Sequence, residues 1–132
     1  LVVGYGRIGK ILSADLRALG ADVTATARKC NDLAWISANG CKAAHTNTLP
    51  EIAGQFDIIF NNVDFEIFKN NFEKLKDSYI YDLSTKGCID YETVKKDGIK
   101  AVKLPGIPGK TSPETAGKII AQTVTQLVKE VI

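Results

Sequence analysis

The chain has 132 residues, of which 45% are apolar and 24% are charged, and its net charge is +2. These values fit one globular domain, and so small an excess of positive charge gives no reason to expect a nucleic-acid or membrane partner. No apolar run approaches the roughly 20 residues that cross a bilayer, so we expect a cytoplasmic protein. Because the chain opens on a core strand, with neither a Met nor a signal peptide, we expect a longer protein with a preceding N-terminal substrate domain.

Short apolar runs alternate with helical patterns from one end of the chain to the other. The expected strands cover residues 1–3, 23–26, 42–45, 57–60, 79–83 and 99–103. The expected helices cover residues 8–19, 31–38, 50–55, 65–75, 90–96 and 113–132. Six strands that alternate with helices predict a parallel sheet with helices on both faces, the doubly wound α/β fold of Rossmann type, in one domain over 1–132.

Several expected helices carry an apolar face. The first helix should pack through Ile8, Ile11, Leu12, Leu16 and Leu19. The helix over 65–75 should pack through Phe65, Phe68, Phe72 and Leu75. The last helix follows a loop rich in proline and glycine over 105–109, and its apolar positions are Ile119, Ile120, Val124, Leu127, Val128 and Val131. This last face would cover the sheet, a missing domain or a partner, so a homo-oligomer stays open.

The residues after the first expected strand match the dinucleotide-binding fingerprint G-x-G-x-x-G. The matching segment is Gly4-Tyr5-Gly6-Arg7-Ile8-Gly9. Its context is typical, because a strand precedes it, a helix follows it, and a second strand comes about twenty residues later. We expect Gly4 to permit a tight turn, Gly6 to let the backbone approach a pyrophosphate, and Gly9 to let the helix pack closely on the strand. The alternative is a glycine-rich turn that binds nothing.

The end of the second strand indicates which dinucleotide is preferred. NAD-binding domains usually place an acid there for the ribose 2′-hydroxyl, whereas this chain reads Thr26-Ala27-Arg28-Lys29. A guanidinium can bind a 2′-phosphate through two hydrogen bonds, while an acid would repel it. Arg28, supported by Lys29, therefore predicts NADP(H) as the cofactor. In the alternative interpretation, both are solvated surface charges before a helix.

The other residues of the predicted cleft follow from the rule that ligands bind at the carboxyl ends of parallel strands. They are Asn61, Asn62, Val63, Ser84, Lys86, Pro105, Gly106, Pro108 and Lys110. Asn61 and Asn62 are candidates to bond the nicotinamide ribose or carboxamide, and Lys86 and Lys110 to attract an anionic substrate. Pro105, Gly106 and Pro108 precede the last helix and would form a cofactor clamp. Loop asparagines also bond backbone, and loop lysines are often only solvated.

Neither a metal site nor a catalytic acid or base can be assigned from the sequence. The three cysteines, Cys30, Cys41 and Cys88, have spacings that fit neither a zinc site nor a redox pair, so we expect free thiols. His45 is the only histidine, with no cysteine near it to share a metal. The catalytic residues therefore stay unknown, and no metal is expected.

Several segments, spread over essentially the whole chain, resemble the A subunit of dipicolinate synthase. They are Val3–Gly9, Leu19–Thr24 with Ala27–Lys29, Asp57–Asn61, Tyr81–Lys86, and Leu104–Lys110 with Ser112–Gly117. The first segment is common to many dehydrogenases. The last is the most specific, because a loop rich in proline and glycine that leads to Thr115-Ala116-Gly117 is typical of this family's C-terminal domain.

The resemblance implies an NADP-dependent oxidoreductase that oxidises a dihydrodipicolinate-type precursor to dipicolinate during sporulation. It also implies a small dicarboxylate as substrate, a partner in the form of a flavoprotein-like B subunit, and an N-terminal domain before the nucleotide-binding domain. The sequence departs from the family after the fifth strand, where Lys86-Gly87-Cys88 stands in place of a Pro-Gly-Gly-like stretch. That departure puts the shape of this loop, and any role of Lys86, in doubt.

Two other functions stay open at this point. One is another NADP-dependent dehydrogenase, of the hydroxyacid or shikimate type. His45 stands in the wrong place for the catalytic histidine of the hydroxyacid enzymes. The other is a regulatory domain that senses NAD(H) without chemistry. Such domains usually keep the acid at the end of the second strand, so Ala27-Arg28 argues against it.

Overall fold

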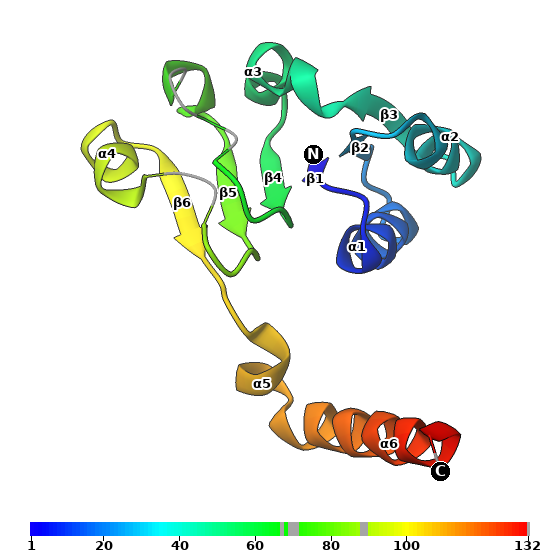
Figure 1. Ribbon diagram of the computed structural model, residues 1–132. Helices are drawn as coiled ribbons and strands as arrows, with labels where there is room; N and C mark the ends of the chain where they lie inside the picture. Colours follow the sequence, from blue (N-terminus) through cyan, green and yellow to red (C-terminus); the bar gives the residue numbers. More distant parts are fainter. Residues whose placement is uncertain (67, 69–71, 88–89, 132) are drawn as a thin grey trace.

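The computed structural model describes residues 1–66, 68, 72–87 and 90–131, and its centre is one parallel sheet of six strands (Figure 1). The strands are β1 (Val2–Val3), β2 (Thr24–Ala27), β3 (Lys42–His45), β4 (Ile58–Asn61), β5 (Tyr79–Asp82) and β6 (Lys100–Lys103). Their order in the sheet is β3-β2-β1-β4-β5-β6. The chain therefore winds outward in one direction from β1 and in the other from β4, which confirms the predicted Rossmann-type fold.

Helices connect the strands, as the alternating sequence pattern predicts. The α-helices are α1 (Arg7–Ala18), α2 (Cys30–Ala38), α3 (Leu49–Ile52), α4 (Tyr91–Lys96), α5 (Ile107–Thr111) and α6 (Pro113–Val131). Three 3-10 turns are also present, η1 (Thr46–Thr48), η2 (Ala53–Gln55) and η3 (Phe72–Leu75). The observed ends differ from the expected ends by one or two residues in most elements. The shift has a consequence at β4, because Asn61 is its last residue and not the first residue of a loop.

Two apolar cores lie on opposite faces of the sheet, because successive strand residues point to opposite faces. Val3 joins one core, to which α3 contributes Leu49 and α4 contributes Val94. Val2 joins the other core, to which α2 contributes Ile36, while Leu12 of α1 packs against it. The sheet is therefore covered by helices on both faces, with α1 and α2 on one face and α3 and α4 on the other.

The face that carries α1 and α2 is open over the other half of the sheet. Ile58, Tyr79 and Val102 point to this face, and each is about half exposed, at 44%, 47% and 49%. Next to them, the rings of Phe60 and Tyr81 stack with 5.5 Å between their centroids. Within the described residues, the layer formed by α1 and α2 therefore ends before β4, as the arrangement in Figure 1 shows.

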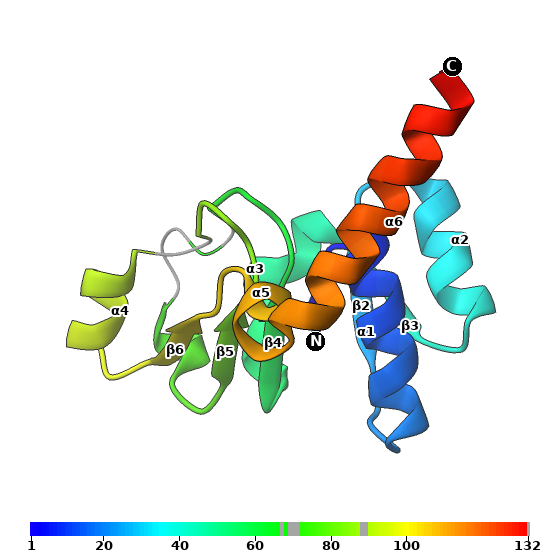
Figure 2. The same ribbon diagram turned by 90° about the horizontal axis from the view of Figure 1, so that it is seen from below.

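Helix α6 lies beyond the carboxyl edge of the sheet and is joined to β6 through α5 (Figures 1 and 2). Its apolar side chains Ile119, Ile120, Val124, Leu127 and Val128 are all more than half exposed. Of the three predicted possibilities for this apolar face, covering the chain's own sheet is therefore wrong. Neither α6 nor any other helix in the described part of the chain is long and apolar enough to cross a membrane.

The expected helix over 65–75 is wrong at its start. Phe65 and Glu66 are not helical, and Phe65 is 41% exposed. Residues 67 and 69–71 lie outside the described part, and the chain next forms the short turn η3. A local tertiary contact accounts for the difference, because the side chain of Asp64 accepts backbone hydrogen bonds from residues 85 and 86 of the next loop. The chain after β4 is thus held to that loop. Phe68 and Leu75 are buried in the core, as expected.

Two further expectations need correction. The segment expected to be only a loop contains α5, which begins after Gly106 in the left-handed conformation and has Pro108 in its first turn. Proline is well tolerated there, since the first turn needs no backbone donor. The apolar face of α1 is only partly buried, because Ile8, Ile11 and Leu19 are 59%, 65% and 84% exposed. Leu12 and Leu16 make the contact with the sheet.

Candidate functional site

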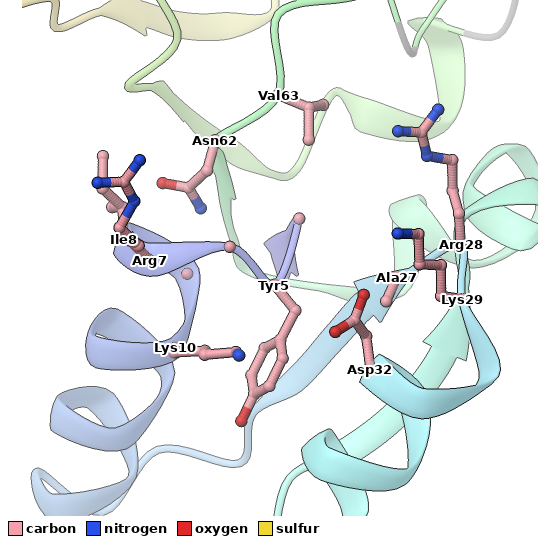
Figure 3. Close-up of a pocket in the computed structure, with 13 residues that line it drawn as sticks. Tyr5, Arg7, Ile8, Lys10, Ala27, Arg28, Lys29, Asp32, Asn62 and Val63 are labelled. Atoms are coloured by element: carbon pink, nitrogen blue, oxygen red, sulfur yellow. The ribbon is translucent and has the colours of Figure 1, made fainter.

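A cavity of about 910 Å³ opens at the carboxyl edge of the sheet, beside β1, where the strand order reverses (Figure 3). Three segments form it: the glycine loop with the start of α1, the link from β2 to α2, and the residues after β4. The lining residues are Gly4, Tyr5, Gly6, Arg7, Ile8, Gly9, Lys10, Ala27, Arg28, Lys29, Asp32, Asn62 and Val63. All the residues of the predicted fingerprint therefore lie around one cavity, together with both predicted cations.

The glycine loop has the geometry that its spacing predicts. Gly4 adopts φ +92°, which side-chain-bearing residues rarely adopt. A Cβ atom on Gly9 would lie 1.9 Å from the carbonyl oxygen of Gly4, so only glycine lets α1 approach the strand this closely. A Cβ on Gly6 would meet nothing within 4 Å, so the backbone there is open to the cavity. The loop thus combines close packing beneath with free space above.

The N-terminus of α1 presents an uncompensated positive end at the cavity. Gly6 is the residue that caps the helix, so no side chain accepts hydrogen bonds from the first backbone N–H groups. The first turn contains no acid, and it includes Arg7. Free N–H groups at the positive end of a helix favour an anion. This end of the cavity is therefore suited to a phosphate group.

The opposite wall begins where β2 ends, at Ala27. The carbonyl oxygen of Arg28 lies 3.1 Å from Nε2 of His45, and its guanidinium lies 5.9 Å from the centre of the Phe65 ring. Lys29 caps α2 without a side-chain hydrogen bond, so this helix too begins with open N–H groups. His45 thus holds the backbone of a cavity residue, a role that its place in the sequence did not indicate.

Two charged residues of the cavity were not singled out from the sequence. Asp32 lies in the first turn of α2, near Lys29 in Figure 3, and Lys10 extends from α1 toward Tyr5. The amino group of Lys10 lies 5.7 Å from the centre of the Tyr5 ring. Burial raises the pKa of Tyr5, and its ring separates the main cavity from a smaller hollow of about 320 Å³. The signal for Asp32 was present in the sequence, as an acid in the helix that follows the second strand.

The two adjacent asparagines after Phe60 have different surroundings. Asn62 lines the cavity, and its side-chain oxygen is buried without a hydrogen-bond partner within the described part of the chain. An unpaired buried acceptor costs about 1–3 kcal/mol, so a donor supplied by a ligand would offset that cost. Asn61 is fully buried and does not line the cavity. Its amide instead bonds Val63 and Asp82.

Asp82, the last residue of β5, is buried at the centre of a polar network. Burial alone would raise the pKa of its carboxyl group. Hydrogen bonds from the side chains of Ser84, Tyr91 and Asn61, and from the Ser84 backbone, outweigh that effect and lower the pKa to about 2. The carboxylate therefore stays ionised at neutral pH. Ser84, expected at the cleft, is buried and bonds Asp82.

The remaining predicted cleft residues lie outside the lining of this cavity. Lys86 is exposed, and its backbone N–H donates to Asp64. Pro105 is partly buried, while Gly106, Pro108 and Lys110 are exposed around α5. The link from β6 to α5 carries these four residues away from the glycine loop, so the structure does not bring them to the cavity wall.

The described residues contain no group of three or more His, Cys, Asp or Glu side chains that could hold a metal ion. Cys30 is exposed and Cys41 is buried, and both are free thiols. Burial raises the pKa of the Cys41 thiol. Cys88 lies outside the described residues. The chemistry available at the cavity is therefore that of cations, backbone donors and amides.

Comparison with known proteins gives one relative by sequence, and no family model matches the chain. The A subunit of dipicolinate synthase from Bacillus subtilis is 35% identical over 133 residues, which cover 98% of this chain and 45% of that protein. Its crystal structure superposes with a TM-score of 0.92, at 34% identity and the same coverage of both chains. The chain therefore spans about half the length of the curated relative that it matches.

Other solved structures agree. The corresponding dipicolinate synthase protein from Bacillus halodurans has a TM-score of 0.86 at 31% identity, over 96% of this chain and 44% of that one. An imine reductase from Myxococcus stipitatus, in complex with NADP+, has a TM-score of 0.65 at 20% identity, over 79% of this chain and 39% of that one. At so low an identity, the second comparison concerns the fold alone.

Proposed function

Because the chain is related in sequence and in fold to the A subunit of dipicolinate synthase, we propose that it is the NADP(H)-binding part of an oxidoreductase that forms dipicolinate. One observation carries the proposal: a single cavity has a glycine loop and an open helix N-terminus on one side, and Arg28 with Lys29 on the other. The relationship and the fold support the broader statement, a nucleotide-binding domain of dehydrogenase type. The preference for NADP and the reaction are the proposal.

The cavity residues fit a dinucleotide with three phosphate groups. The pyrophosphate would lie at the N-terminus of α1, where Gly6 leaves the backbone open. Arg28 and Lys29 would hold the 2′-phosphate at the end of β2, where Ala27 replaces the acid that prefers a 2′-hydroxyl. Asn62, with its unpaired oxygen, would accept a hydrogen bond from a ribose hydroxyl or a carboxamide. The bound nicotinamide would supply hydride acceptance.

The cofactor preference can be measured directly. We expect a fluorescence titration, with energy transfer from Trp35, to show that NADPH binds about tenfold more tightly than NADH, a difference of about 1.4 kcal/mol. The substitution Arg28→Ala should remove this difference by weakening NADPH alone, because only NADPH carries the 2′-phosphate. Lys118→Ala removes a cation on α6, far from the cavity, and should change neither affinity. Equal or tighter binding of NADH by the wild type would contradict the proposal.

The reaction that we propose is oxidation of dihydrodipicolinate to dipicolinate, with hydride transfer to NADP. The name of the curated relative supports the product, and with it a small dicarboxylate as substrate, a partner in the form of a flavoprotein-like B subunit, and a role in sporulation in the cytoplasm. Because that relative is about twice as long, we propose that the chain works with an additional N-terminal substrate domain. Lys86 and Lys110 would attract the anionic substrate from outside the cavity.

The test of the reaction uses the complete protein, with and without a B-type subunit. Formation of NADPH that depends on dihydrodipicolinate would support the proposal. Oxidation of a hydroxyacid or a shikimate-type substrate in its place would indicate another dehydrogenase. Tight nucleotide binding with no hydride transfer to or from any of these substrates would indicate a sensing domain.

A further inference from the structure

The buried carboxylate of Asp82 lies at the end of β5, beside the loops that follow β4 and β5. Its Oδ1 atom accepts hydrogen bonds from the Asn61 amide at 2.8 Å, from the Ser84 hydroxyl at 2.6 Å and from the Ser84 backbone N–H at 3.0 Å. Its Oδ2 atom accepts one from the Tyr91 hydroxyl at 2.6 Å. Asp82 has no exposed surface. It therefore does not touch a ligand in the cavity.

The carboxylate determines how the Asn61 side chain is oriented. Asn61 and Asp82 are register partners in neighbouring parallel strands, so their side chains point to the same face of the sheet. An ionised carboxylate can only accept hydrogen bonds, so the NH₂ group of Asn61 must face it. The reversed amide would place two oxygens in contact in a buried site. Asp82 thus selects one of the two amide orientations.

The selected orientation holds the turn that places Val63. The oxygen of the Asn61 amide accepts a hydrogen bond from the Val63 backbone N–H at 3.2 Å, and its NH₂ group donates to the Val63 carbonyl at 2.9 Å. Both bonds need the same amide orientation, because one uses the oxygen and the other the nitrogen. The turn after β4 is therefore tied to the charge on Asp82.

Val63 in turn touches both the glycine loop and the cavity. It lines the cavity, and its Cγ1 atom would lie only 2.6 Å from a Cβ atom on Gly4, so its side chain occupies the space that this glycine leaves. A line of contacts thus runs from Tyr91 of α4 through Asp82, Asn61 and Val63 to the first glycine of the loop. This line joins a helix remote from the cavity to the cavity wall.

We propose that Asp82 is a positioning residue for the bound dinucleotide, which acts through Asn61 to set Val63 in the cavity wall. The inference rests on the proposed function, since it assumes that the dinucleotide binds in this cavity. A carboxylate that served only to stabilise the fold would act through all its partners alike. The proposed role depends on the Oδ1 side, which faces Asn61, and not on the Oδ2 side, which faces Tyr91.

Two variants on the two sides of the same carboxylate separate these roles. Asp82→Asn removes the charge that orients Asn61, and we expect the Kd for NADPH to rise about fivefold or more. Tyr91→Phe removes one hydrogen bond from the far oxygen, and we expect its melting temperature to fall while the Kd stays within twofold of wild type. Equal increases in Kd in both variants would mean a general structural role and would overturn the proposal.

A double-mutant cycle tests the route through Asn61. If Asp82 acts through this amide, then Asp82→Asn should change the Kd for NADPH little when Asn61→Ala is already present, because coupled residues are not additive. Additive effects of the two substitutions on the Kd would show that the route is wrong. Asn61→Ser replaces Asn61→Ala in the cycle if the latter does not fold.

A readout without nucleotide keeps this test separate from the proposed function. In ¹⁵N-resolved spectra of the unliganded chain, Asp82→Asn should shift the backbone amide signals of Val63 and Gly4, whereas Tyr91→Phe should leave them in place. Unchanged Val63 and Gly4 signals in Asp82→Asn would overturn the inference. If the wild type binds neither NADPH nor NADH, the proposed function fails, and these spectra still decide whether Asp82 sets Val63.

Discussion

Charge at the cavity is distributed unevenly between its residues. Four cations, Arg7, Lys10, Arg28 and Lys29, line it together with a single carboxylate, that of Asp32. The open N-termini of two helices add further positive potential. A cleft lined by one sign of charge concentrates ligands of the opposite sign, so these residues favour a ligand that carries several phosphates. Asp32 is the exception, and its position gives it a specific effect.

We expect Asp32 to limit the preference for NADPH. Its carboxylate lies on the same wall as Arg28 and Lys29, where a 2′-phosphate would bind, so it repels that group and not a 2′-hydroxyl. An exposed charge pair is worth about 0.2–1 kcal/mol, so Asp32→Asn should raise the preference for NADPH over NADH about two- to fivefold. Parallel titrations with the two nucleotides measure it. Asp15→Asn makes the same charge change on α1, outside the cavity, and should leave the ratio unchanged.

The sequence indicated most of the cavity wall but not Asp32 or Lys10, for a reason that can be stated at single residues. The usual rule looks for an acid at the end of the second strand, where this chain has Ala27. The first turn of α2 brings Asp32 back to the same wall, and this depends on where the helix begins. Lys10 faces the cavity because of the rotation of α1, which the spacing of apolar residues does not fix.

At the scale of elements, the packing of α1 on β1 and the opening of the glycine loop depend on different glycines. We expect Gly9→Ala to destabilise the fold by at least about 2 kcal/mol, because its Cβ would overlap the Gly4 carbonyl and the helix would have to move away. Gly6→Ala should leave stability nearly unchanged, since nothing lies within 4 Å, but should weaken nucleotide binding. Thermal unfolding and the NADPH titration measure the two effects. A stable Gly9→Ala variant would contradict this account of the packing.

Elements with strong local patterns were predictable, and those set by tertiary contacts were not. The six strands and their order of connection follow from alternating apolar runs and the right-handed crossover rule. The helix expected over 65–75 has a good apolar spacing, but Asp64 holds the preceding residues to the β5 loop. The end of β4 was placed one residue early, so Asn61 was assigned to the cleft. Its buried bonds to Asp82 are invisible in a sequence, because the two residues meet only through the register of the sheet.

At the scale of the whole molecule, two apolar surfaces have no cover within the described residues. One is the face of β4 to β6 that carries Ile58, Tyr79 and Val102, and the other is the exposed side of α6. Exposed apolar patches of this kind usually mark surfaces that bind another protein element. The sheet and its cavity do not depend on α6, which packs on α5. The nucleotide site and the arm can therefore be altered independently.

We expect the isolated chain to associate with itself through the apolar side of α6. Val124 and Leu127 are three residues apart, so they lie together on one side of the helix, and both are more than half exposed. Replacing both with lysine should shift the chain toward the monomer in sedimentation experiments, because charge on the stripe opposes burial of its apolar surface. The melting temperature and NADPH affinity should change little, since the arm is remote from the sheet and the cavity. Gln122→Lys adds a charge on the opposite side of α6 and should leave association unchanged, whereas a wild-type chain that stays monomeric at high concentration would refute the expectation.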